Sequence, residues 1–167
     1  MLIVHKLIPR GQGLSPVLLR RAPTVELDWD TRQRSRFEAL DSHGRRLAVV
    51  LARGTLVRGG DVLVAEDGSL VSVRAAPQPL LLVQPCPDHG SAFDLLRATY
   101  HLGNRHVAIE LQSDHLKIEP DHVLAQMLEQ MHLVVRPVQA PFEPEAGAYS
   151  THATPHGHSH PHDHSHE

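Results

Sequence analysis

The chain has 167 residues, of which 41% are hydrophobic, 21% charged and only 4% aromatic, and its formal net charge is −3. The near balance of 16 Lys and Arg against 19 Asp and Glu, together with the few aromatic residues, argues against nucleic-acid binding. No apolar run approaches the roughly 20 residues of a membrane span, and the N-terminus lacks the basic leader of a secretory signal. We therefore expect a cytoplasmic protein that does not cross a membrane.

The first 76 residues carry the signals of short strands separated by turns. Glycine and aspartate mark turns between apolar runs at spacings of about 8 to 12 residues, which is typical of a small β sandwich or barrel. The predicted strands are 2–8, 36–41, 47–51, 62–65 and 70–73. No helix is required in this part of the chain. We predict an all-β domain over residues 1–76, of a partner-binding or peptide-binding kind.

A proline-bearing segment at residues 75–79 marks a change of character and indicates a domain boundary. The elements predicted beyond it are strands at 80–84, 106–111, 115–118 and 133–138, and helices at 88–100 and from residue 120. Asp88 or Ser91 can cap the first of these helices. The order βαββαβ is the ferredoxin-like pattern. We therefore expect an α+β protein whose second domain, residues 77–139, is ferredoxin-like. Met127 and Met131 are interpreted as core residues of the second helix, and Cys86, the single cysteine, as structural.

Residues 140–167 are rich in Pro, Gly, Ser and His and have almost no apolar periodicity, so we predict a disordered tail. Imidazole is a good ligand for Ni²⁺, Cu²⁺ and Zn²⁺, and alternate histidines can wrap around one ion. The alternatives are an expression tag and a neutral low-complexity tail, but engineered tags run their histidines consecutively. The predicted metal-binding residues of the tail are His152, His156, His158, His160, His162, His164 and His166.

A second cluster spans residues 101–106, with the sequence HLGNRH. On a strand, His106 and Glu110 would point to the same face, with His101 in the preceding turn. One protomer offers too few imidazoles here for a closed site, although a two-fold axis would double them. From the spacing alone, a surface or helix-capping role for His106 is the favoured interpretation.

Other charged and imidazole groups have plainer interpretations. Arg32, Arg34 and Arg36 alternate and could form a basic stripe for a partner, but a solvated face is the favoured interpretation. His89 and His132 belong to a scattered set that no spacing links.

Three segments together resemble a known family. They are HLGNRH at 101–106, DHVL at 121–124 followed by Met127, and PFEPEAGAY at 141–149 ahead of the histidine-rich tail. They resemble urease accessory protein E, the nickel metallochaperone of urease maturation. The match extends upstream to Asp30, Arg32, Arg36 and the turn at 60–63, so it covers nearly the whole chain.

The resemblance implies Ni²⁺ held between the protomers of a homodimer, with Zn²⁺ or Cu²⁺ as other ions that bind. His106 matches the interfacial ligand of the family, and tail histidines would complete its shell. His122 matches a peripheral metal position in some members, but Pro120 stands here where those members have a second histidine. Implied partners are the urease accessory GTPase, protein G, and the urease apoprotein complex. The dimer could become a tetramer with metal.

Two functions follow as hypotheses. The first is a carrier that delivers Ni²⁺ to the urease maturation complex, and the alternative is a buffer or store of divalent metal that acts through its tail. A zinc hydrolase using His101, His106 and Glu110 is a third and weaker reading, since the chain lacks the HExxH pattern. We expect no enzymatic activity.

Overall fold

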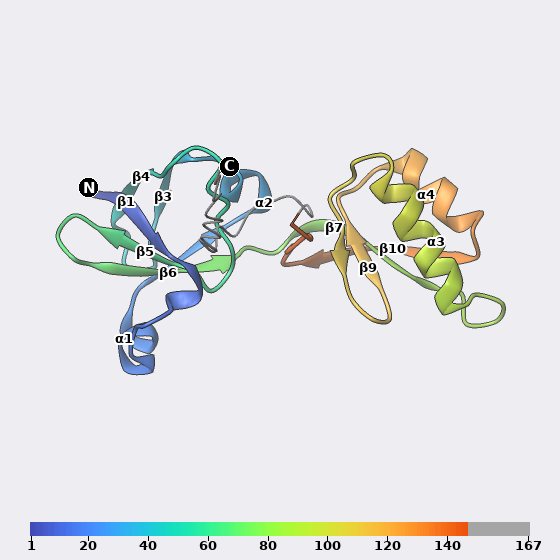
Figure 1. Ribbon diagram of the computed structural model, residues 1–167, viewed down its shortest axis with the longest axis horizontal. Coiled ribbons are helices and arrows are strands. Elements are labelled where there is room, and N and C mark those ends of the chain that lie inside the picture. Colours follow the sequence, from blue (N-terminus) through green and yellow to red (C-terminus); the bar gives the residue numbers. More distant parts are fainter. Residues whose placement is uncertain (147–167) are drawn as a thin grey trace, which may run out of the picture.

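The computed structural model describes residues 1–146, which form an N-terminal and a C-terminal domain lying end to end (Figure 1). The first domain ends with strand β6 (Leu70–Ala75), and the second begins with β7 (Gln78–Pro85). Within these residues, no helix has the length and apolar character needed to span a membrane.

The N-terminal domain is built on one six-stranded sheet of order β2-β6-β5-β1-β4-β3. Besides β6, its strands are β1 (Leu2–Ile8), β2 (Thr24–Leu27), β3 (Arg36–Leu40), β4 (Arg46–Val50) and β5 (Val62–Ala65). All the strands predicted in this part are confirmed, and β2 was missed. The pairs β1–β4 and β2–β6 are parallel, and the other pairs are antiparallel. Alternate side chains, such as Leu47 and Val49 of β4, fill the core.

The sheet curls until its two edges approach each other. Ser42, just after β3, donates from its backbone N to the carbonyl of Thr24 in β2 at 2.7 Å, and Thr24 N donates to Ser42 Oγ at 3.0 Å. The domain therefore has one nearly closed sheet rather than the two of a sandwich. The barrel alternative describes it better.

The prediction that residues 1–76 need no helix is wrong. The structure has a 3-10 turn η1 (Pro9–Gly11) and two short helices, α1 (Pro16–Arg21) and α2 (Trp29–Arg32). Ser15 caps α1 by accepting a hydrogen bond from Val17 N at 3.3 Å, and Asp28 caps α2 by accepting one from Thr31 N at 2.9 Å. Both helices are too short to display an apolar stripe, so periodicity did not detect them.

The C-terminal domain has a four-stranded antiparallel sheet of order β10-β7-β9-β8, against which two helices pack (Figure 1). Its further elements are α3 (Ala92–Gly103), β8 (Glu110–Leu111), β9 (Leu116–Ile118), α4 (His122–Glu129) and β10 (Leu133–Ala140). The predicted chain order of strands and helices, βαββαβ, is confirmed. Leu95, Leu102 and Leu128 from the helices pack with Val83 and Ile118 from the sheet, and Met127 and Met131 pack against this cluster as predicted.

α3 and α4 each begin directly after a residue whose side chain caps the helix. Ser91 and Asp94 form a capping box, in which Ser91 Oγ accepts from Asp94 N at 3.3 Å and Asp94 Oδ2 accepts from Ser91 N at 3.0 Å. Asp121 Oδ1 accepts from Val123 N and Leu124 N at 2.8 and 2.9 Å. Of the two predicted caps for α3, Asp88 and Ser91, the structure has Ser91, so the helix begins at Ala92.

The tail does not begin at residue 140 as predicted. β10 continues to Ala140, and the side chain of Phe142 is fully buried against Trp29 and Leu80. The prediction of disorder was wrong for residues 140–146, because their apolar side chains contact distant parts of the chain and so leave no local periodicity. The prediction of disorder for 147–167 lies outside the described residues.

Candidate metal centre

His106 lies just beyond α3 with left-handed backbone geometry, at a φ of 57°. The helix ends in a Schellman motif, in which His106 N donates to Gly103 O at 2.9 Å and Val107 N donates to Leu102 O at 3.2 Å. Val107 packs against the core cluster that contains Leu102. The prediction that His106 lies on a strand is therefore wrong, because β8 comprises only Glu110–Leu111.

The left-handed position of His106 is costly for any residue with a Cβ. The penalty is about 1–2 kcal/mol, and glycine, which avoids it, is the usual residue at this position. The His106 side chain is exposed, and it stands at the negative end of the α3 dipole, where a cation is favoured. A strained residue that exposes an imidazole at the negative end of a helix is a reasonable functional candidate.

Glu110 does not share a site with His106. It is buried, its Oε1 pairs with Lys117 Nζ at 2.7 Å, and its Oε2 accepts from Glu143 N at 2.7 Å. Both oxygens of Glu110 thus have partners within the fold. His101 is half-buried, and its ring packs edge-on against Tyr100 at 5.4 Å between centroids. His101, His106 and Glu110, the residues considered for a zinc hydrolase, therefore do not form a shared metal site in the described part of the chain.

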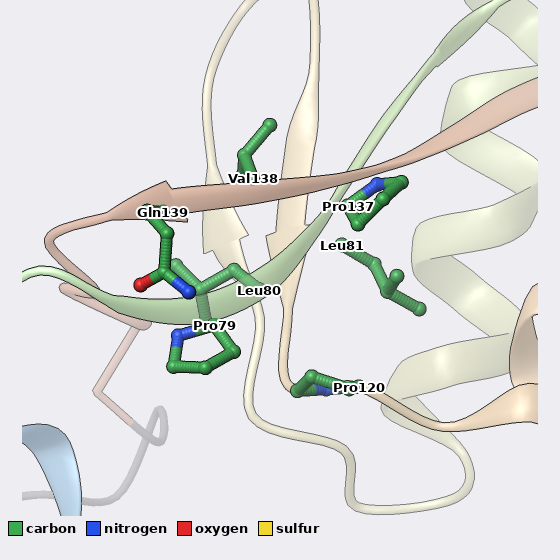
Figure 2. A pocket seen from close by; sticks show the side chains of 7 residues that line it. All are labelled: Pro79, Leu80, Leu81, Pro120, Pro137, Val138 and Gln139. Carbon is green, nitrogen blue, oxygen red and sulfur yellow. The ribbon is translucent and has the colours of Figure 1, made fainter.

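His122 is the first residue of α4 and is exposed. It follows the N-cap Asp121, so its position is accounted for by the helix start. Pro120 lines a shallow hollow beside the paired strands β7 and β10 (Figure 2). The hollow is lined by Pro79, Leu80, Leu81, Pro120, Pro137, Val138 and Gln139. None of these side chains is a metal ligand of the histidine, cysteine or carboxylate type, so the hollow offers no coordination site.

Residues 141–145, which follow β10, join the two domains, and we call this segment the clasp. Its main contact in the N-terminal domain is Arg32. Arg32 is fully buried, and its Nη1 donates to Glu143 Oε1 at 2.7 Å, while its Nε donates to Leu27 O at 3.2 Å and its Nη2 donates to Phe142 O. Burial lowers the pKa of Arg32 from its usual range, and the charge of Glu143 opposes that shift. The prediction of a solvated arginine face is therefore wrong for Arg32, because the segment that covers it is 110 residues away in sequence.

Further contacts hold the clasp against both domains. Arg58 Nη1 donates to Pro144 O at 2.6 Å and pairs with Glu143 Oε2 at 3.2 Å, and Gly59 N donates to Glu143 Oε1 at 2.8 Å. Trp29 meets Phe142 edge-to-face at 6.0 Å. Glu145 N donates to Ile109 O at 2.8 Å. The clasp thus holds residue 145 against Ile109, three positions along the chain from His106.

An apolar stripe lies exposed on α3, between its start and His106. Phe93, Leu96 and Tyr100 are 65%, 66% and 66% exposed, and Val123 on α4 is 60% exposed. The buried face of α3 uses Leu95, Ala98 and Leu102, so the stripe lies outside the core. Large apolar side chains grouped on one helix mark an interaction surface.

One group of three metal-binding side chains occurs among residues 1–146, and sequence reasoning missed it. It comprises Cys86, Asp88 and His89, whose ligating atoms lie within 4.8 Å of one another. Neither His106 nor His122 belongs to such a group in the described part of the chain. The remaining predicted ligands lie outside the described residues: His152, His156, His158, His160, His162, His164 and His166.

Comparison with known proteins places these features in a family. Residues 4–76 match the model of the N-terminal domain of the UreE urease accessory protein, and residues 78–167 match the model of its C-terminal domain. A relative from Albidiferax ferrireducens, named urease accessory protein UreE, is 72% identical over 95% of this chain and 91% of its own length. A relative of the same name from Polaromonas naphthalenivorans is 68% identical over 95% of this chain and 75% of its own length.

Proposed function

This chain belongs to the UreE family of urease accessory proteins, and on that premise we propose that it is a cytoplasmic nickel metallochaperone that delivers Ni²⁺ to the urease maturation complex. The observation that carries the proposal is His106, an exposed imidazole kept in a left-handed conformation at the end of a helix with an apolar outer stripe. We also propose that the C-terminal domain is ferredoxin-like, which its order of elements and its antiparallel sheet support.

The proposed nickel site lies between two protomers. A single His106 is too few ligands for a metal site, but a two-fold axis near the end of α3 doubles the imidazoles. The stripe of Phe93, Leu96 and Tyr100 supports such a dimer because it leads along α3 to His106. The metal would then be shared by the protomers, and a dimer of dimers could form around further ligands.

Leu96→Glu is expected to turn the dimer into a monomer. Burying one leucine contributes about 1.5–3 kcal/mol, and symmetry counts it twice, so the dimer should weaken by roughly 10² to 10⁴ fold. Light scattering over a dilution series measures this. Leu40→Glu is the matched control, since Leu40 is 63% exposed but lies in β3 of the other domain, and it should leave the mass unchanged. A Leu96→Glu protein that stays dimeric would exclude the α3 stripe as the interface.

The histidines beyond residue 150 are proposed to complete the nickel shell and to load the site, with His152 the first of them. The clasp supports this, because Glu145 is held at Ile109 and seven residues of extended chain reach at most about 25 Å. Imidazoles exchange readily, which suits an ion that must be released to a partner. Zn²⁺ and Cu²⁺ are further ions the same ligands accept. His122 is a peripheral ligand in this proposal, without the second histidine of some members.

The carrier and the storage alternative differ in what remains when the tail is removed. In a chain ending at Tyr149, we expect nickel calorimetry to find about one tight site per dimer, while the full chain binds several more ions through its extra histidines. Loss of all nickel binding in the shorter chain would instead support storage by the tail. Because ligating imidazole must be deprotonated, binding should weaken as the pH falls below about 6.

The proposed partners follow from the family. They are the urease accessory GTPase, protein G, which receives the ion, and the urease apoprotein complex. The N-terminal domain is the proposed partner-binding part. The contacts of Arg32 with Glu143 and of Arg58 with Pro144 would hold a partner bound there at a fixed place relative to the metal-binding domain. The chain carries out no catalysis in this proposal, and transfer of the ion is an exchange of ligands.

A further inference from the structure

We propose that Cys86, Asp88, His89 and His132 form a second divalent-metal site, at the end of the C-terminal domain opposite His106. The four residues come from the loop between β7 and α3 and from the turn between α4 and β10. The site goes beyond the proposed nickel-delivery function and does not depend on it. Its ligand is a borderline cation of the zinc class, which accepts sulfur, imidazole and carboxylate together.

The distances suit such an ion. Cys86 Sγ lies 3.7 Å from His89 Nδ1, and the ligating atoms of Cys86, Asp88 and His89 are mutually within 4.8 Å. In a tetrahedral zinc site with bonds of about 2.0–2.3 Å, neighbouring ligand atoms stand roughly 3.3–3.8 Å apart. The Cys86 and His89 atoms are therefore already at coordination spacing, and a carboxylate oxygen of Asp88 lies within 4.8 Å of both.

His132, which lies outside the group of three, is the fourth donor of the proposed site. Its ring lies 5.3 Å from the His89 ring between centroids, at an interplanar angle of 83°. Like His106, it has a left-handed backbone, with a φ of 63°, where glycine would be the less strained residue.

The backbone holds the two segments together before any metal binds. Cys86 N donates to His132 O at 3.0 Å, and Gly90 N donates to Cys86 O at 2.8 Å. A Cβ on Gly90 would lie 2.2 Å from Cys86 N and 2.7 Å from His132 O, so the close approach requires glycine. Pro85 and Pro87 restrict the chain on either side of Cys86. The donors are thus presented by a restrained loop.

This site is separate from His106 because the two stand at opposite ends of α3. A helix of 12 residues is about 18 Å long, which is too far for the two sites of one protomer to share an ion. On binding, the Cys86 thiol releases its proton to solvent and the thiolate ligates the metal. A bound ion would tie the β7–α3 loop to the α4–β10 turn, so it should stabilise the domain.

Cobalt(II) titration of the full reduced chain tests the site. Cys86 is the single cysteine, so a thiolate-to-cobalt charge-transfer band can arise only there, whatever the tail histidines bind. We expect a band whose amplitude at saturation corresponds to one thiolate-bound cobalt per chain, and we expect zinc to abolish it. Cys86→Ser should remove it, and His89→Ala and His132→Asn should each raise the half-saturation concentration at least ten-fold. Asparagine is chosen at 132 because it tolerates the left-handed backbone.

His106→Ala and His43→Ala are the matched controls and should leave the band unchanged, so this site and the nickel site can fail independently. A second readout is the thermal midpoint, which zinc should raise by more in the parent chain than in Cys86→Ser, because the variant keeps only the histidine sites. Circular dichroism of the metal-free variants checks that each is folded. Absence of a thiolate band in the parent chain would overturn the proposal. So would a band unaffected by both His89→Ala and His132→Asn.

Discussion

His106→Gly is expected to abolish the inter-protomer nickel site and, at the same time, to make the metal-free protein more stable. Glycine removes the left-handed penalty of roughly 1–2 kcal/mol but adds about 0.5–1 kcal/mol of backbone freedom in the unfolded chain. The free energy of unfolding should therefore rise by about 0.5–1 kcal/mol, or roughly 2 °C in melting temperature. Calorimetry with nickel and denaturation with a chelator measure the two effects on a chain ending at Tyr149.

Two further variants separate the imidazole from the backbone. His106→Ala should lose the same nickel site without the gain in stability, because alanine keeps a Cβ in the left-handed region. His132→Gly, the other left-handed histidine, should gain stability and keep the inter-protomer nickel site. If His106→Gly still bound about one nickel per dimer, the interfacial site would be excluded. If it were less stable than the parent, the strain argument would be wrong.

Glu143→Ala is expected to lower the free energy of unfolding by about 3 kcal/mol, at the lower end of the roughly 3–5 kcal/mol for breaking a buried ion pair. The lower end applies because Arg32 is fully buried but the Glu143 side chain is 34% exposed. The substitution leaves the Arg32 guanidinium without its counter-ion, removes the acceptor of Gly59 N, and leaves Arg58 Nη1 with only the carbonyl of Pro144. Urea denaturation measures the loss, and the two domains should then unfold in separate transitions.

Glu145→Ala is the matched control for the clasp. Glu145 is an exposed glutamate in the same segment, and its contact with Ile109 is made by its backbone, so the change should stay within about 0.5 kcal/mol. In the double variant Arg32→Leu with Glu143→Leu, the loss should be smaller than the sum of the single losses, because no unpaired charge remains. A Glu143→Ala protein within 1 kcal/mol of the parent would mean that the clasp does not couple the domains.

Much of the fold follows from local signals. The strands β1, β5 and β7 show as apolar runs between turn residues, and Asp121 marks the start of α4, so these elements were predicted close to their observed bounds. The short helices α1 and α2 were missed because one or two turns bury too little to show a period. The exposure of Phe93 and Leu96 could not be predicted, because hydrophobicity alone does not distinguish a core residue from an interface residue.

The candidate site, too, was predicted from the sequence only in part. The sequence by itself determined that the chain is rich in imidazole, that its elements run βαββαβ after residue 77, and that HLGNRH and PFEPEAGAY belong together in one family. These are properties of residue type, spacing and order along the chain, which local chemistry and hydrophobic periodicity express directly.

Only the tertiary structure decided what those residues do. It placed a left-handed His106 just beyond the end of α3, buried Arg32 against Glu143 from 111 residues away, and brought His132 beside Cys86 and His89. The physical reason is that each of these outcomes depends on contacts between segments distant in sequence, whose free energy comes from burial, ion pairing and backbone hydrogen bonds in the assembled fold. The spacing of residues along the chain therefore does not predict these contacts.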